Sequence, residues 1–182
     1  MNKIIEYAVD MFPYMTVSAP IIVLIRILIY KIKKKEKINW HHEFGCIMFL
    51  IFMVGLSSQT FEIGPNKSLF KINIIPFKVI IDTYKEVFIN GNINHFIVNF
   101  LGNIIMFMPI GFALPLLWKI KTKRVVLIGL YYSMLIEFSQ LFLSRGTDID
   151  DLWLNTLGVI LGLAIYKLLN KKYNRYIYKF KY

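Results

Sequence analysis

Cysteine and acidic residues are scarce in this sequence of 182 residues. It contains one cysteine, Cys46, which excludes a disulfide framework and a cysteine-based metal cluster. Asp and Glu number 11 against 22 Lys and Arg, and charged residues make up only 18% of the chain. A soluble domain is about a quarter charged and about half apolar. Here 57% of the residues are hydrophobic, an excess too large for one soluble core.

The apolar residues occur in long blocks that contain almost no charge. Several blocks approach the roughly 20 residues that cross a hydrocarbon layer about 30 Å thick. A soluble helical bundle would need polar helix faces, whereas these segments are apolar nearly all round. We therefore predict an all-α, polytopic membrane helix bundle, a single domain over 1–182, with about five transmembrane helices. Their expected ranges are about 11–30, 40–60, 96–118, 125–143 and 150–169.

The basic residues are concentrated in short segments next to the apolar blocks. Fifteen of the 22 lie in 31–37, 119–124 and 167–182, which together contain one acidic residue, Glu36. The net charge of +11 suggests nucleic-acid binding, but this placement favours positively charged cytoplasmic flanks of helices. Five crossings put all three segments on one side. We predict a multi-pass cell-membrane protein with the N-terminus outside, the C-terminus cytoplasmic and no nucleic-acid partner.

A shorter segment, about 75–88, has the pattern of an amphipathic helix. Its apolar side chains, such as Ile80 and Tyr84, fall on one face, and charged ones, such as Asp82 and Lys85, fall on the other. It is too short and too charged to span a bilayer. We expect one interfacial helix that lies on the outer surface of the membrane.

Polar side chains gather at the outward ends of the last three expected membrane helices. An ionisable group in hydrocarbon costs roughly 2.5–3.5 kcal/mol, so each one needs a partner or water. Ser133, Glu137, Gln140 and Ser144 follow one another at spacings of 4, 3 and 4, which places them on one stripe of a helix. The candidate ligand-binding residues are Asn99, Asn103, Glu137, Gln140, Arg145, Asp148, Asp151 and Asn155.

Arg145 is the only basic residue close to this group in sequence. Its guanidinium is the natural counter-ion for Glu137, Asp148 or Asp151, and its geometry suits a carboxylate or a phosphate. No set of three metal ligands is evident among these residues, and we predict no metal and no cofactor.

Structural roles compete with ligand binding at these positions. Thr147 and Asp150 fit an N-cap pair for the last membrane helix, and acids at a helix N-terminus are favoured by its dipole. The alternative role of the two asparagines near the start of the third helix is to form hydrogen bonds between helices. For Glu137, the alternative is a salt bridge that joins two helices.

Five fragments of the sequence together resemble the VanZ-like family. The pattern N-x-x-x-N at 99–103, followed by F-M-P-I-G-F at 107–112, resembles the motif of its third helix. The pattern E-x-x-Q at 137–140, followed by R-x-x-D-x-x-D-x-x-x-N-x-x-G at 145–158, resembles its second signature. The segment I-N-I-I-P-F at 72–77 is similar to the start of many members. Their order and spacing make the resemblance specific.

The resemblance covers about residues 72–165 and implies an integral membrane protein associated with resistance to the glycopeptide teicoplanin. It implies action at the outer face of the cell membrane on a membrane lipid or a lipid-linked cell-wall precursor. The competing hypothesis is an outer-leaflet membrane enzyme with Glu137 as general base, although no obvious nucleophile is present. A transporter is disfavoured, because five helices without inverted repeats offer little basis for alternating access.

Overall fold

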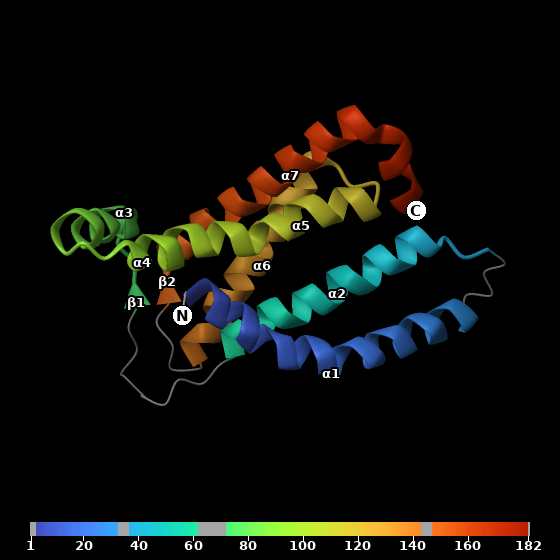
Figure 1. Cartoon of the computed structure of the whole chain (residues 1–182), viewed down its shortest axis with the longest axis horizontal. Coiled ribbons are helices and arrows are strands. Elements are labelled where there is room, and N and C mark those ends of the chain that lie inside the picture. Colours follow the sequence, from blue (N-terminus) through green and yellow to red (C-terminus); the bar gives the residue numbers. More distant parts are fainter. Residues whose placement is uncertain (1–2, 33–36, 62–71, 143–146, 182) are drawn as a thin grey trace.

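The structure is a computed structural model that describes residues 3–32, 37–61, 72–142 and 147–181. Within these ranges the chain forms a bundle of long helices, as Figure 1 shows, which confirms the predicted all-α fold. Four segments are long and apolar enough to cross a membrane, and the chain is therefore a membrane protein. These four are Val9–Ile32, Trp40–Gln59, Phe96–Leu117 and Ile149–Phe180.

The first two helices, α1 (Lys3–Ile32) and α2 (Trp40–Phe61), form an antiparallel pair. Two prolines lie inside α1, and the hydroxyl of Thr16 donates a hydrogen bond to the carbonyl of Pro13 at 2.8 Å. Hydroxyl side chains often satisfy the backbone around prolines in membrane helices. Apolar side chains of α1 such as Phe12, 65% exposed, face away from the bundle, as expected for contact with lipid.

The closest packing in the bundle is between α5 (Asn103–Leu117) and α7 (Ile149–Ile177). Glycine makes this approach possible: a Cβ atom added at Gly111 would overlap the carbonyl oxygen of Val159, and one added at Gly162 would overlap that of Met108. Small residues at an interface let two membrane helices approach at their backbones. The third predicted membrane helix consists of α4 (Ile93–His95), the π-helical η2 (Phe96–Gly102) and α5 in succession.

Helix α6 (Thr122–Phe142) packs against α7 and also touches α5 and α2. Val125 at its start is fully buried in the main core, together with Ile110 and Val159 from the two neighbouring helices. Within the described residues, α6 is not among the four segments that are long and apolar enough to cross a membrane. A fifth crossing, which the sequence suggested, stays a prediction.

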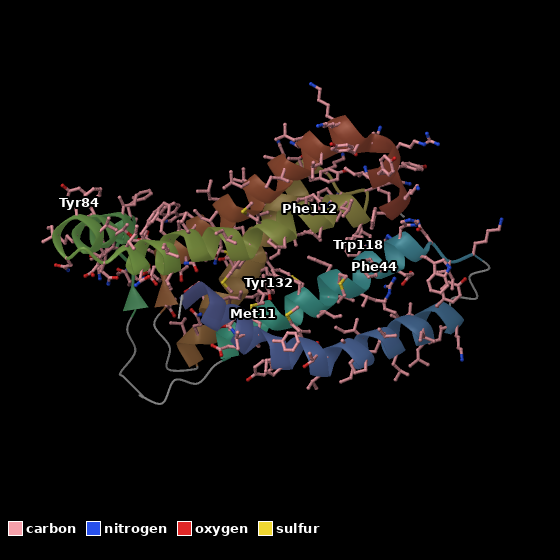
Figure 2. All side chains as sticks on the ribbon, viewed as in Figure 1. Met11, Phe44, Tyr84, Phe112, Trp118 and Tyr132 are labelled. Atoms are coloured by element: carbon pink, nitrogen blue, oxygen red, sulfur yellow. The ribbon has the colours of Figure 1, made fainter. Side chains whose placement is uncertain are left out.

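Two short elements and a small helix lie at the end of the bundle where α7 begins. Strand β1 (Ile72–Asn73) pairs in parallel with β2 (Thr147–Asp148), with Ile72 opposite Thr147. Helix α3 (Lys78–Tyr84) and the π-helical η1 (Lys85–Ile89) follow, close to the expected range of the interfacial helix. Val79 packs into a small core with Ile104 and Leu154, whereas other apolar side chains are exposed, including Tyr84 at 61%, which projects from this end in Figure 2.

At the opposite end, α7 continues well beyond the predicted limit near residue 169. It bends at Tyr173, where φ is −124° and ψ is 35°, and ends at Ile177. A short 3-10 helix, η3 (Tyr178–Phe180), then turns back toward α2. The basic segment that the sequence suggested as a tail is therefore mostly helical. Ile177 within this segment is buried in the core and anchors the segment to the bundle.

The two ends of the bundle differ in charge. The acidic end is where α6 ends and α7 begins, and it carries Glu137, Asp148, Asp150 and Asp151. The basic end is where α5 and α7 end, and it carries Lys119, Lys121, Lys123, Arg124, Lys167, Lys171, Lys172, Arg175, Lys179 and Lys181. Trp118 lies at the basic end between α5 and α2 (Figure 2), with its ring 6.0 Å from that of Phe49.

Candidate functional site

Asp148 connects three elements at the acidic end. It is the N-cap of α7, where its Oδ1 accepts a hydrogen bond from the backbone N–H of Asp150 at 2.9 Å. The same oxygen accepts from Nδ2 of Asn73 on β1 at 2.8 Å. Its own backbone N–H donates to Oε2 of Glu137 on α6 at 3.0 Å. Asp148 therefore has a structural role that fixes the positions of β1, α6 and α7.

Glu137 lies near the end of α6 and is only 6% exposed. Its carboxylate accepts the hydrogen bond from Asp148, and its backbone carbonyl accepts a hydrogen bond from the hydroxyl of Thr147 at 3.4 Å. A buried carboxylate needs hydrogen-bond donors or an opposite charge, because its desolvation is costly. The Asp148 N–H holds the Glu137 carboxylate, and the Thr147 hydroxyl holds its backbone, between the end of α6 and the start of α7.

Asn103 and Asp151 join α5 to α7 at the same level. The Nδ2 group of Asn103 donates to Oδ1 of Asp151, and also to the backbone carbonyl of Asn99 at 3.3 Å. Asn103 is the first residue of α5, and Asp151 lies in the first turn of α7. The predicted proximity of these two side chains is therefore present, with a carboxylate of one helix bonded to an amide of the other.

One turn deeper, Asn155 on α7 contacts Ser133 on α6. The Nδ2 group of Asn155 donates to the Ser133 hydroxyl at 2.9 Å, and these side chains are 4% and 0% exposed. The Oδ1 atom of Asn155 is buried and has no hydrogen-bond partner among the described residues. This leaves an acceptor oxygen that is available to a donor from a ligand or from water.

Two further candidate residues, Asn99 and Gln140, have no described side-chain hydrogen bond to this group. Asn99 is exposed, and only its backbone carbonyl takes part in the contacts above. Gln140 is partly buried, and its Oε1 atom has no hydrogen-bond partner in the described ranges. Arg145, the predicted counter-ion, lies outside the described residues. Its pairing with a carboxylate therefore remains a prediction.

Asp150 has a larger role than the sequence suggested. It is fully buried and does not N-cap α7, because Asp148 does so. Its carboxylate instead accepts hydrogen bonds from the backbone N–H groups of Phe77 at 2.6 Å and Val79 at 2.7 Å, and from Nε1 of Trp153 at 2.8 Å. Asp150 thus caps the first turn of α3. The capping interpretation was right in kind and wrong about the helix.

The backbone conformation before α3 explains why this carboxylate is needed. Phe77 has a φ of 63°, a left-handed conformation that non-glycine residues rarely adopt, and no side chain of its own segment caps α3. The first N–H groups of a helix lack partners within the helix. Asp150 supplies the missing acceptor, and it lies 71 residues from Val79 in the sequence. No local motif indicates a partner at that distance.

The chemistry available at the acidic end is that of hydrogen-bond acceptors. Carboxylates and amide oxygens bind hydroxyl and ammonium groups well. No group of three His, Cys, Asp or Glu side chains within the described ranges is arranged to hold a metal ion. We name Asn103, Glu137, Asp151 and Asn155 the polar cluster, because each comes from one of three packed helices and each lies at or near a helix–helix contact.

These features define a helical membrane protein with a polar cluster at one end of its bundle, in which Glu137 and Asn155 are buried and Asn103 and Asp151 are partly buried. Residues 44–170 match the model of the VanZ/LLP1 family. Because the match covers more than half of the chain, the protein belongs to that family, as the sequence fragments predicted. The match includes α2, which those fragments did not reach. No curated protein and no solved structure gives a significant match to the chain.

Proposed function

We propose that this protein binds the polar head of a membrane lipid or lipid-linked cell-wall precursor at its acidic end, on the outer face of the cell membrane. Through that binding it lowers susceptibility to teicoplanin. The observation that carries the proposal is the polar cluster itself, in which Asp151 and Asn103 meet across two helices next to the buried carboxylate of Glu137. Polar groups at such positions in membrane helices mark functional sites.

Unused acceptors in and beside the polar cluster support a ligand that carries hydroxyl or amino groups. Asn155 Oδ1 and Gln140 Oε1 are buried without a described donor, and an unsatisfied buried acceptor costs about 1–3 kcal/mol. From the residues that the structure describes, Asp151 accepts a hydrogen bond from Asn103 through Oδ1, and its second oxygen is assigned to a donor of the ligand. The head groups of lipid-linked sugars and peptides carry many such donors. Arg145, two residues before β2 in the sequence, is assigned to the anionic part of the same ligand.

The basic end supports the outward orientation of the acidic end. Positive residues flank membrane helices on the cytoplasmic side. The polar cluster lies where α5 and α7 begin, whereas Lys119 follows the end of α5 and Lys179 lies in η3 after the end of α7. A cysteine at position 146 is expected to react in intact cells with a thiol reagent that cannot cross the membrane. Cys46, 1% exposed, serves as the unreactive background, and labelling only after lysis would contradict the orientation.

Three variants test the ligand-binding proposal in a teicoplanin-susceptible host that expresses the full chain. Arg145→Ala and Asp151→Asn are expected to abolish the gain in resistance at unchanged membrane abundance. Glu137→Gln keeps the shape and hydrogen bonding of the side chain and is expected to retain it. If the unaltered chain produces no change in teicoplanin susceptibility, the envelope function is wrong.

A second candidate, a membrane enzyme with Glu137 as general base, is favoured by the burial of that carboxylate. It makes a different prediction for one variant. Glutamine cannot accept a proton, so Glu137→Gln would then lose the phenotype as completely as Arg145→Ala does. Retention of the phenotype in Glu137→Gln excludes general-base catalysis by this residue.

A further inference from the structure

Two cavities lie side by side at the basic end and share two lysines. The first has a volume of about 300 Å³ and is lined by Asn39, His41, Lys119, Tyr178, Lys179 and Lys181. The second, of about 280 Å³, is also lined by Lys119 and Lys181, with Lys121 and Lys167 in addition. Among the described residues that line them, neither cavity has an acidic side chain. We name the first cavity and its six lining residues the basic cleft.

The wall of the basic cleft is held in place by the core. Ile177 is buried, so the chain that follows it is anchored. The carbonyl of Phe180 lies 2.9 Å from Nδ1 of His42, and the carbonyl of Lys181 accepts a hydrogen bond from Nδ2 of Asn39 at 3.3 Å. These contacts fix η3 against the start of α2. Lys179 of η3 and Lys181 after it are therefore held at the same cavity as Lys119, which follows α5.

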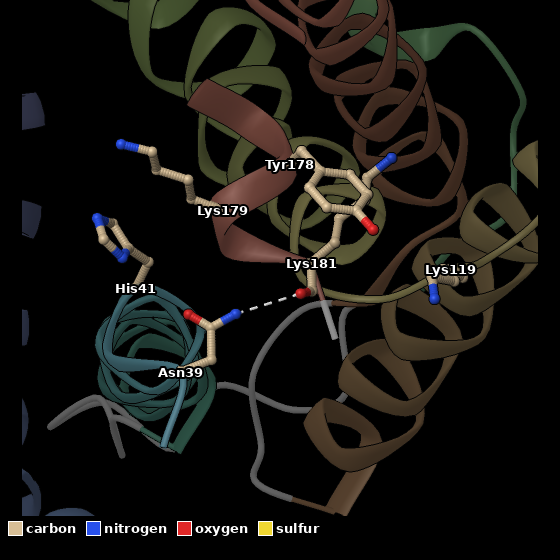
Figure 3. Close-up of a pocket in the computed structure, with 6 residues that line it drawn as sticks. All are labelled: Asn39, His41, Lys119, Tyr178, Lys179 and Lys181. Carbon is tan, nitrogen blue, oxygen red and sulfur yellow. Dashed lines mark hydrogen bonds between the residues drawn. The ribbon is translucent and has the colours of Figure 1, made fainter. Parts of the chain in front are cut away.

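Figure 3 shows how the side chains lie in the basic cleft. Lys179 from η3 and His41 from α2 extend in the same direction, and the ring of Tyr178 lies beside the backbone of Lys181. The dashed line marks the hydrogen bond between Asn39 and Lys181. Lys119 lies on the other side of the cleft from Lys179 in this view, and the ammonium groups of Lys179 and Lys181 lie 5.6 Å from the ring centroids of Tyr176 and Tyr166, respectively. Three lysines, an amide, an imidazole and a phenol line the cleft, and their N–H and O–H groups are donors suited to an anionic head group.

We propose that the basic cleft binds the phosphate group of an anionic phospholipid. A lipid fits better than a soluble phosphate because the cleft lies at the end of membrane-spanning helices. Leu168, 69% exposed, directly follows Lys167 of the second cavity and offers an apolar surface for an acyl chain. Basic pockets between membrane helices are known to hold such head groups. This inference does not depend on the function proposed for the acidic end.

The test compares two triple variants of the full chain purified in a neutral detergent. Lys119→Gln, Lys179→Gln and Lys181→Gln together remove the lysines of the basic cleft. Lys171→Gln, Lys172→Gln and Arg175→Gln remove the same charge from α7, where these exposed residues line neither cavity. Binding of phosphatidylglycerol and of phosphatidylcholine is measured by native mass spectrometry.

We expect the cleft variant to bind phosphatidylglycerol about tenfold or more weakly, and the control variant to change less than about twofold. Phosphatidylcholine, which has no net charge, should bind the unaltered chain weakly. Equal losses in both variants, no loss in the cleft variant, or equal binding of the two lipids would each overturn the proposal. If the triple variant does not fold, the single variant Lys179→Gln at an exposed side chain gives the same test with a smaller change.

A competition experiment separates a lipid from a soluble phosphate. Inorganic phosphate is added to the complex of the unaltered chain with phosphatidylglycerol. A lipid site should keep its lipid, because the phosphate alone lacks the acyl chains. Displacement by inorganic phosphate at an equal concentration would show that the ligand is a soluble phosphate, and the lipid assignment would be wrong.

Discussion

The acidic and basic ends of the bundle hold their charged residues in different ways. At the acidic end, Asp148 and Asp150 accept hydrogen bonds from backbone N–H groups, an amide and an indole, and they hold three elements together. At the basic end, the lysines of the cleft have no acidic neighbour among its lining residues. Asp148 and Asp150 therefore stabilise the fold through hydrogen bonds, whereas the lysines of the basic cleft form no ion pair with the residues that line it. The predictions below test that contrast from the largest effect to the smallest.

Removing the Asp150 carboxylate should have the largest effect on stability. Asp150→Ala leaves three N–H groups, one buried and two partly buried, without their acceptor, so we expect a loss of about 3–5 kcal/mol in the free energy of unfolding. Asp10→Ala removes an exposed acid of α1 and should change it little. Denaturant unfolding in detergent micelles measures both. A loss below about 1 kcal/mol for Asp150→Ala would contradict the capping role.

The contact between α5 and α7 is shared by both ends, so disrupting it should affect them together. Gly162→Ala places a methyl group against the backbone of Met108, and we expect a destabilisation of about 2–3 kcal/mol. In Gly102→Ala the nearest atom would be the carbonyl oxygen of Ile97 at 3.5 Å, an ordinary contact, so this variant is the control. Thermal unfolding compares the two. Equal melting temperatures for the two variants would mean that α5 and α7 accommodate the added methyl group without a loss of stability.

The buried pair of Ser133 and Asn155, one turn deeper than the Asn103–Asp151 contact, should show a measurable coupling. In a double-mutant cycle of Ser133→Ala and Asn155→Leu, we expect a coupling energy of about 1 kcal/mol, since such bonds in membranes range from roughly 0.6 to 1.7 kcal/mol. Unfolding in detergent gives the four stabilities. Strictly additive effects would show that this hydrogen bond does not contribute.

The smallest effect is expected for the ion pair toward the basic end. Arg26 Nη2 lies 2.6 Å from Glu43 Oε2, and the two side chains are 23% and 24% exposed. Ion pairs that water reaches contribute about 0.2–1 kcal/mol, so a cycle of Arg26→Gln and Glu43→Gln should give a coupling near the lower limit. A coupling larger than that of the Ser133–Asn155 pair would reverse the contrast between the two ends.

Much of this architecture was predictable because its causes are local. The apolar blocks indicated membrane helices, and the α-helical period placed Ser133 and Glu137 on one stripe, where both side chains are buried. The boundaries were less accurate. α1 begins at Lys3 rather than near residue 11, and α7 ends at Ile177 rather than near 169. Hydropathy reports the length of the apolar block and does not report where the backbone hydrogen bonds end.

The sequence by itself determined the class of the protein, its family and the position of the polar residues along the helices, because hydrophobic transfer and helical periodicity act over short segments. Only the tertiary structure decided which partner each acid takes. Asp150 meets the start of α3 across 71 residues, and Asn39 meets Lys181 across 142. Such contacts depend on how helices pack and turn in space. The roles of the acidic and basic ends follow from that packing.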